Sequence, residues 1–175
     1  MVGPGRQERS WIRGARAGSV SDLEALFREH WPRAHRAAYL VVQDAAAAED
    51  IAQEAFLSAL RNLDSFDRRR PFGPWLHRIV VNRAIDWARM RALRPESGGD
   101  ALAGVAAAEH ADAREGLLAA IRSLPPDHRA VIVLRYLLEY TPGEIARLLD
   151  LPRGTVNSRL RRALDALGGK LEDER

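Results

Sequence analysis

Two helix patterns separated by only three residues fill the stretch from 141 to 169, and no other feature constrains the fold as strongly. The sequence Thr-Pro-Gly-Glu at 141–144 is typical of a capping box with proline at the first helical position, so it predicts a helix that begins there and runs to about Leu149. Residues 150–152 interrupt the pattern, because proline disfavours helical geometry in the residue before it. A second helix is then predicted from about Gly154.

The second helix separates apolar from cationic side chains. Its apolar residues recur at helical spacing and fall on one side: Val156, Leu160, Ala163 and Leu167. The other side and its flanks carry charged or hydrogen-bonding groups: Arg153, Thr155, Asn157, Ser158, Arg159, Arg161 and Arg162. A short turn followed by such a helix is the arrangement that enters the major groove of DNA, where arginine can pair with guanine and asparagine with adenine. A solvated basic helix in an ordinary bundle is the alternative.

The rest of the chain also has helical patterns, and its composition divides it in two. No segment alternates apolar and polar residues as a strand would, so the predicted fold class is all-α. Residues 94–113 combine proline, a glycine pair, small residues and acidic side chains, which is typical of a flexible linker. We therefore expect two small helical domains, residues 1–93 and 114–175, joined by this acidic linker, with the helix-turn-helix in the second.

Four helices are expected in the first domain, at residues 11–17, 21 to about 40, 45 to about 63, and 74 to about 92. Ser21 with Glu24 would cap the second helix, and Asp44 would cap the third. The outer face of the third helix is acidic. The fourth helix aligns a polar, cationic stripe formed by Arg78, Asn82, Asp86 and Arg89.

Composition excludes several classes of function. The chain has no cysteine, which excludes disulfides, thiolate metal sites and cysteine nucleophiles. Its net charge is only +3, but 26 of its 27 basic residues are arginine, the side chain suited to bidentate contacts with phosphate and base edges. No apolar run is long enough to cross a membrane, and the N-terminus has no apolar core of a signal peptide. We therefore expect no membrane insertion and a cytoplasmic location.

An enzyme would need a catalytic constellation, and the sequence offers only scattered candidates. Asp50, Glu54, His77 and Asp86 could serve as acids or bases. However, the five histidines are dispersed, and the sequence has neither an H-E-x-x-H metal motif nor a glycine-rich phosphate loop. We therefore expect a protein that is not an enzyme and that needs no cofactor or metal.

Four segments, in this order, resemble one protein family: "AEDIAQEAFLSALRNLDSF", "PFGPWLHRIVVNRAIDWARMR", "SLPPDHRAVIVLRYLLEYTPGEIA" and "PRGTVNSRLRRAL". They are similar to regions 2 and 4 of the extracytoplasmic-function (ECF) sigma factors, the promoter-reading subunits of bacterial RNA polymerase. The resemblance covers nearly the whole chain. A stand-alone helix-turn-helix regulator, which would bind duplex DNA without polymerase, is the alternative, but it would not require the polar faces of the first domain.

The resemblance assigns a partner to each face. It implies that the third helix docks on the clamp helices of the largest polymerase subunit through Asp50, Gln53, Glu54 and Leu57. It implies that the loop at 62–70 and the fourth helix recognise and open the -10 element of promoter DNA through Ser65, Phe66, Arg68, Arg69, Arg78, Asn82, Asp86 and Arg89. On the -35 duplex, the last helix would read bases with Asn157, Ser158, Arg161 and Arg162, and hold phosphates with Arg153, Thr155 and Arg159.

The roles of the aromatic residues stay open at this point. Phe66 and Phe72 could stack on an unpaired base, although aromatic residues at loop edges more often pack against the core. Trp75 and Trp87 are expected to pack in the core. Part of the helical segment at 124–140 would be free for the polymerase flap or for an anti-sigma factor, the usual inhibitor in this family.

Overall fold

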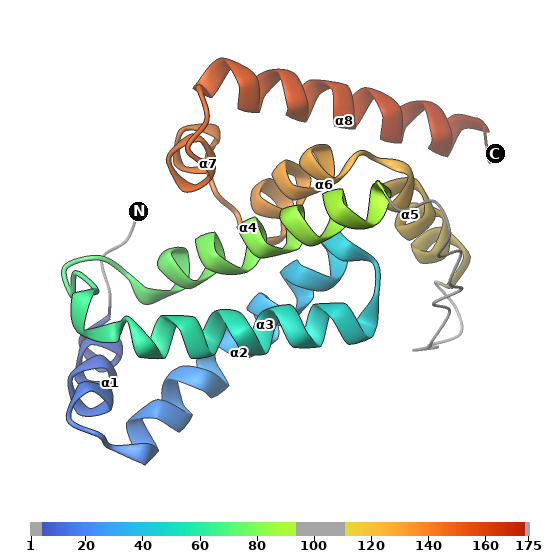
Figure 1. Cartoon of the computed structure of the whole chain (residues 1–175). Coiled ribbons are helices and arrows are strands. Elements are labelled where there is room, and N and C mark those ends of the chain that lie inside the picture. Colours follow the sequence, from blue (N-terminus) through green and yellow to red (C-terminus); the bar gives the residue numbers. More distant parts are fainter. Residues whose placement is uncertain (1–4, 94–110, 174–175) are drawn as a thin grey trace.

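The computed structural model describes residues 5–93 and 111–173, and every regular element within them is a helix (Figure 1), which confirms the all-α prediction. The N-terminal half contains α1 (Arg6–Arg16), α2 (Val20–Val42), α3 (Ala45–Arg61), a 3₁₀ turn η1 (Leu63–Ser65) and α4 (Phe72–Ala92). The C-terminal half contains α5 (Ala111–Ser123), α6 (Pro126–Ile132), a π turn η2 (Val133–Leu137), α7 (Pro142–Leu149) and α8 (Arg153–Asp173). Residues 94–110 of the expected linker lie outside the described residues.

The start of α2 differs from the prediction. Its N-cap is Ser19, whose hydroxyl accepts a hydrogen bond from the backbone N–H of Asp22 at 3.3 Å, so the assignment of the cap to Ser21 was wrong. The reason is Gly18, which adopts φ +84, a left-handed conformation that ends α1 and lets the next residue extend at once. Asp44 caps α3 as predicted, because its side chain accepts a hydrogen bond from the N–H of Ala47 at 3.0 Å.

Helix α4 begins at Phe72, slightly before the predicted start at Pro74. Pro71 is its N-cap, in extended conformation. Pro74 therefore falls in the first turn, where its missing N–H leaves no intrahelical hydrogen bond unmade. This placement explains why a proline is tolerated in a helix that is otherwise buried along one side.

The core of the N-terminal half forms where α2 packs against both α3 and α4. Leu26, Phe56 and Leu76, one from each of these helices, are almost fully buried. Trp75 and Trp87 are partly buried and pack against this core, as expected from their spacing. Burial of this kind contributes about 25 cal/mol per Å² of apolar surface, which makes it the main source of stability for the three-helix arrangement.

The helix-turn-helix forms as predicted. The side chain of Thr141 accepts a hydrogen bond from the N–H of Glu144 at 3.3 Å, and the Glu144 carboxylate accepts one from the N–H of Thr141 at 2.9 Å, which completes the capping box. The helix ends at Leu149, and Asp150 takes a left-handed φ of 55°. The apolar series on α8 is buried as expected: Val156, Leu160, Ala163 and Leu167.

The two halves pack against each other, which the sequence did not predict. Helix α6 contacts both α2 and α4, and α7 contacts α4. Figure 1 shows α8 along the top of the view, with α6 between it and α4. The buried apolar residues form one cluster that runs from Ile12 in α1 to Leu167 in α8. In this structure the two domains therefore share a continuous core.

Candidate nucleic-acid interface

The free face of α8 carries most of the residues predicted to contact duplex DNA. Four of them are exposed: Arg153, Asn157, Arg161 and Arg162. Thr155 and Ser158 are half-buried, and the Ser158 hydroxyl donates to the backbone oxygen of Thr155 at 3.0 Å, within the helix. Arg159 is also half-buried, because its Nη1 lies 3.3 Å from Oδ1 of Asp127 in α6. The exposed arginines and asparagine leave donors and acceptors available to base edges and phosphates.

The polar stripe on α4 forms as the spacing predicted, with Arg78, Asp86 and Arg89 exposed and Asn82 half-buried. Each of the two terminal nitrogens of the Arg89 guanidinium forms an ion pair. Its Nη1 lies 3.8 Å from Asp86 of the same helix, and its Nη2 lies 2.6 Å from Oδ1 of Asp127. The end of the stripe is therefore bound to the C-terminal half of the chain.

The loop at 62–70, which includes η1 and leads into α4, presents three of its four predicted contact residues to solvent: Ser65, Arg68 and Arg69. Arg69 and Asp67 form an ion pair at 3.0 Å. The hydrogen bond from the Arg69 side chain lowers the pKa of the Asp67 carboxyl, which keeps it charged beside the guanidinium. The loop thus combines exposed cations with a local carboxylate that holds one of them in place.

Phe66, the fourth predicted residue of the loop, is only 6% exposed. Its ring lies 5.8 Å from that of Phe72 and 4.7 Å from that of Trp75, measured between centroids. Aromatic rings at these separations pack favourably. The buried position favours the packing role over stacking on a base, because so little of the residue's surface is open to solvent.

Arg16 in α1 positions this loop, a contact that the sequence analysis did not predict. Its guanidinium donates to three backbone oxygens, those of Leu63 at 2.9 Å, Asp64 at 3.0 Å and Phe66 at 2.6 Å. The acceptors are main-chain atoms 47 to 50 residues away in the sequence, so no side-chain motif marks the contact. Charge-assisted hydrogen bonds of this kind are stronger than neutral ones, so Arg16 holds the loop against the N-terminal helix.

The acidic face of α3 is exposed as predicted at Asp50, Gln53, Glu54 and Leu57. Two of these side chains have partners within the chain. Gln53 donates to the Glu49 carboxylate at 3.2 Å, and Glu54 accepts from Nη1 of Arg83 in α4 at 2.6 Å. Leu57 keeps 53% of its surface exposed. The face offers charge and one apolar contact to a partner.

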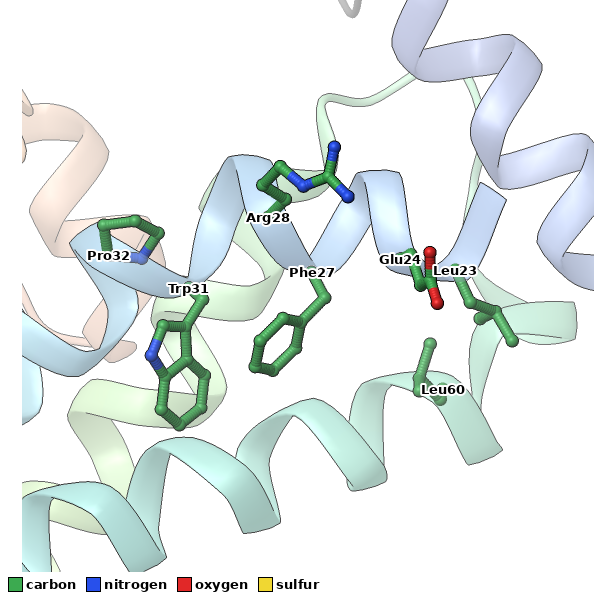
Figure 2. Close-up of a pocket in the computed structure, with 7 residues that line it drawn as sticks. All are labelled: Leu23, Glu24, Phe27, Arg28, Trp31, Pro32 and Leu60. Carbon is green, nitrogen blue, oxygen red and sulfur yellow. The ribbon is translucent and has the colours of Figure 1, made fainter. Parts of the chain in front are cut away.

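An apolar hollow of about 560 Å³ lies between α2 and α3, next to this face (Figure 2). Phe27 and Trp31 of α2 stack at 4.8 Å, and both rings point toward α3. Leu23 and Leu60 close the hollow at one end, while Glu24 and Arg28 stand at its edge. The sequence analysis did not identify these residues, although Leu23, Phe27 and Trp31 recur at a helical spacing of four.

A second cleft, of about 600 Å³, separates the loop and α4 from α7. Arg70, Trp75 and Arg78 line it from the N-terminal half, and Tyr140 and Arg147 line it from the C-terminal half. Arg78, the first residue of the polar stripe on α4, therefore faces the first helix of the helix-turn-helix across this cleft.

His77, weighed from the sequence as a possible acid or base, is buried at the floor of the contact between the halves. Its Nδ1 lies 2.8 Å from the Tyr140 hydroxyl. Burial, with smaller contributions from His30 and Arg33, lowers the pKa of His77 to about 3, so the imidazole is neutral near pH 7. A neutral, buried ring is poorly placed for proton exchange with a substrate in solvent.

Neither a metal-ligand cluster nor a membrane-length helix occurs in the part of the chain that the structure describes. No group of three or more histidine, aspartate or glutamate side chains gathers there in a way that could hold a metal ion. No described helix is both long and apolar enough to cross a bilayer.

Both halves of the chain match known families. Residues 26–94 match the family model of Sigma-70 region 2, and residues 114–167 match that of Sigma-70, region 4. The chain is 35% identical over 173 residues to the ECF RNA polymerase sigma factor SigW of Bacillus subtilis (strain 168), an alignment covering 89% of this chain and 90% of that protein. It is 36% identical over 157 residues to the ECF RNA polymerase sigma-E factor of Escherichia coli (strain K12), covering 79% and 82%.

A solved structure extends the similarity to the arrangement of the helices. The structure of CnrH in complex with the cytosolic domain of CnrY superposes with a TM-score of 0.71 at 28% sequence identity. The superposition covers 97% of this chain and 99% of that chain, so it includes both halves.

Proposed function

The chain belongs to the ECF family of RNA polymerase sigma factors, and from that membership we propose how its surfaces divide the work of promoter recognition. The function is that of a sigma factor, which directs sequence-specific initiation of transcription by core polymerase. The stand-alone regulator is not supported, because both the region 2 and the region 4 models match and the curated relatives align over both halves. In the proposal, residues 1–93 bind core polymerase and the -10 element, the linker is 94–113, and residues 114–175 bind the -35 element.

We assign recognition of the -35 element to α8. Its exposed Asn157, Arg161 and Arg162, with Ser158 beside them, would reach base edges in the major groove, and Arg153 with Thr155 would hold phosphates. Arg159 has the same proposed role, but its guanidinium is paired with Asp127 in this structure. It would have to exchange that carboxylate for a phosphate.

We assign recognition and opening of the -10 element to the loop and the α4 stripe. Opening a duplex requires a surface that binds the unpaired strand better than the paired one, which cationic side chains beside a shaped pocket can provide. The exposed Arg68 and Arg69 lie in the loop, and Arg78 lines the adjacent cleft with Trp75. The proposed set is completed by Ser65, Asn82, Asp86 and Arg89, while Phe66 supports the loop from within the core.

We assign docking on core polymerase to the exposed face of α3. An acidic surface would repel DNA phosphates but suits a basic protein partner, and Leu57 adds an apolar contact at its edge. The clamp helices of the largest polymerase subunit are the proposed partner for Asp50, Gln53, Glu54 and Leu57. The polymerase flap is the proposed partner for part of the C-terminal domain.

We propose that the chain performs no catalysis and acts in the cytoplasm, where it would redirect the chemistry of polymerase without a cofactor of its own. An anti-sigma factor is a further proposed partner. The solved structure of CnrH, whose fold covers almost all of this chain, contains the cytosolic domain of CnrY bound to it.

The observation that carries the proposal is that an exposed acidic face, a cationic stripe and a cationic helix-turn-helix occur together in one chain of this family. Run-off transcription with purified core polymerase, on a template that carries the DNA upstream of the chain's own gene, tests it. The expected result is a discrete transcript that requires both the chain and core polymerase. A chain that binds this DNA tightly but never supports a transcript with core would contradict the proposal.

A further inference from the structure

Helix α1 carries four arginines along one side. Arg6, Arg9, Arg13 and Arg16 recur at spacings of three, four and three, which places them within about 80° of one another around the helix. The first three are exposed, and among the residues that the structure describes none of them has an ion-pair or hydrogen-bond partner for its side chain. Because α1 precedes the segment 26–94 that matches Sigma-70 region 2, that match assigns these arginines no role.

The one acidic residue of α1 is turned away from this stripe. Oε1 of Glu8 lies 3.1 Å from Nε2 of His30 in α2, and the two side chains are only 15% and 13% exposed. The carboxylate therefore faces the inside of the domain and does not neutralise the arginines. The outer surface of α1 presents positive charge alone.

The helix is held rigidly beneath the stripe. Ile12 is fully buried in the core, and a Cβ on Gly14 would collide with the carboxylate of Asp22, so α1 and α2 approach each other too closely there for a larger residue. Arg16 ends the stripe and bonds to the backbone of the loop at 62–70. The exposed arginines are therefore presented by a fixed support, which lowers the entropic cost of binding a partner.

The stripe is unfavourable for the helix itself. Like charges three or four residues apart destabilise a helix, and Arg6 and Arg9 lie near its N-terminus, where the helix dipole disfavours cations. The N-cap is Gly5, which supplies no side-chain hydrogen bond to the free N–H groups of the first turn. An anion bound along this face would relieve each of these costs, so the arrangement suits a negatively charged partner.

The stripe continues the surface proposed to hold the opened -10 strand. Helix α1 lies beside the turn that links α3 to α4 (Figure 1), and it contacts η1 directly. Beyond η1, the loop exposes three more cations: Arg68, Arg69 and Arg70. The exposed acid at the junction is Asp64, which lies 3.9 Å from Nε of Arg16. A strand held at the loop therefore has its backbone next to α1.

The spacing of the arginines suits a sugar-phosphate backbone. A helix rises about 1.5 Å per residue, so the Cα atoms of Arg6, Arg9 and Arg13 are about 4.5 and 6 Å apart along its axis. Successive phosphates of a stacked strand advance by about 3.4 Å, and an unstacked strand extends further. A single strand can also follow the change of direction from the loop to α1, whereas duplex DNA is stiff over about 150 base pairs.

We propose that Arg6, Arg9 and Arg13 bind the phosphodiester backbone of single-stranded DNA and so extend the -10 surface beyond the loop at 62–70. The inference rests on the proposed function for the identity of the strand. Each guanidinium contacts a phosphate and none reads a base, so the stripe adds affinity for the opened strand without adding sequence preference. It retains the strand once the duplex has opened.

Binding of the full chain to a labelled single-stranded DNA of 20 nucleotides and mixed sequence, followed by fluorescence anisotropy, tests the stripe without polymerase or promoter. Combining Arg6→Gln, Arg9→Gln and Arg13→Gln should weaken binding at least fivefold at low salt. It should also lower the salt slope by about 2, because each phosphate contact with a single strand contributes about 0.7. The corresponding triple lysine variant keeps the charge and should recover most of the slope.

The matched control removes three exposed arginines from α2 through Arg28→Gln, Arg33→Gln and Arg36→Gln. The control has the same net charge as the α1 variant, and it should weaken binding less than twofold. The duplex of the same sequence should also lose less than twofold in the α1 variant. Equal effects of the two triple variants, or an equal loss for duplex and single strand, would overturn the proposal. So would a loss of affinity for core polymerase with unchanged binding of the oligonucleotide, because it would assign the stripe to a protein partner.

Site-specific crosslinking locates the strand on α1. The natural chain has no cysteine, so Ser10→Cys, at an exposed position among the arginines, can carry a single benzophenone label. It should crosslink the single strand at least threefold more than a label at Glu29→Cys on α2, and equal yields would contradict the proposal. The stripe and the proposed function can fail separately. A chain that crosslinks through position 10 but supports no run-off transcript refutes only the function, and an active chain whose single-strand binding ignores the α1 variant refutes only the stripe.

Discussion

Arg83 and Glu54 form an ion pair at 2.6 Å that ties α4 to the exposed face of α3. The helix proposed to dock on polymerase is thereby bonded to the helix proposed to open the -10 element. The Glu54 side chain remains 65% exposed, so it can exchange Arg83 for a basic group of a partner. Docking and the position of α4 are therefore linked through one carboxylate.

Combining Gln53→Ala with Glu54→Ala should weaken binding to core polymerase by about 1–3 kcal/mol, or roughly 5-fold to 150-fold, which is typical of the loss of interface anchors. Titration of labelled chain with core polymerase measures the change. Glu29→Ala, at an exposed position on α2, is the matched control and should bind core normally. Binding of the full double variant to duplex DNA should not fall, and core binding that is unaffected by the double substitution would refute the docking assignment.

Arg16→Ala should loosen the loop that follows η1, because three backbone oxygens lose a charged donor. Loss of such contacts costs about 2 kcal/mol, so the free energy of unfolding should fall by about that amount. Permanganate reactivity of thymines in the -10 element should fall more than the footprint of the closed complex on DNA. Arg28→Ala, which removes an exposed arginine of α2, should change neither quantity.

Arg161 and Arg162 are adjacent on α8, so their side chains diverge by about 100° and cannot share one base. Arg162→Ala should cost about 1–3 kcal/mol and relax the preference at a single -35 position, whereas loss of a phosphate-contacting arginine should weaken binding to all sequences alike and lower the salt slope by roughly one. Transcription from a library of -35 variants separates these patterns. A uniform loss across the library with Arg162→Ala would show that this residue holds DNA by charge alone.

The buried His77 should make the free energy of unfolding depend on pH. Its pKa is about 3 in the folded chain and 6.5 when exposed, so between these values the unfolded state binds the extra proton. The free energy of unfolding should therefore decrease as the pH falls below about 6.5, by at most about 1.4 kcal/mol per pH unit from this group. The groups that face it, His30, Arg33 and Tyr140, are present in both the natural chain and the variant.

Urea unfolding of the natural chain and of His77→Gln, between pH 7.5 and 4.5, isolates this contribution as the difference between the two slopes. His35→Gln replaces a histidine that stacks on Trp31 in α2, and it should keep the slope of the natural chain. Parallel curves for the natural chain and His77→Gln would mean that the imidazole is not held neutral in the folded state.

The elements that the sequence predicted well are those whose signals are local. The capping box at Thr141, the cap at Asp44 and the apolar series of α8 each depend on residues within a turn or two of one another, and each forms as expected. The cap of α2 was misplaced because two serines compete and the deciding factor is the left-handed backbone of Gly18.

The contacts that the sequence did not predict are all long-range. Arg89 meets Asp127 at a separation of 38 residues, and His77 meets Tyr140 at a separation of 63. Periodicity identifies which side chains share a face, but it does not say which faces meet. The docking of the two halves therefore became visible only in three dimensions, and with it the contact of both Arg89 and Arg159 with Asp127.

The π turn at η2 adds a geometric condition to that docking. The N–H of Leu138 bonds to the oxygen of Val133, five residues back, so the helix takes one residue more there than an α-helix would. One extra residue corresponds to about 100° of helical rotation. This residue comes before Tyr140 in the chain, so it sets the direction in which the Tyr140 side chain points toward His77. Deletion of a single residue from 133–137 should therefore turn Tyr140 away from α4 and break its contact with His77, which lowers the free energy of unfolding measured in urea. Insertions and deletions in this turn would thus change how the two halves of a sigma factor pack together while every contacting side chain is retained.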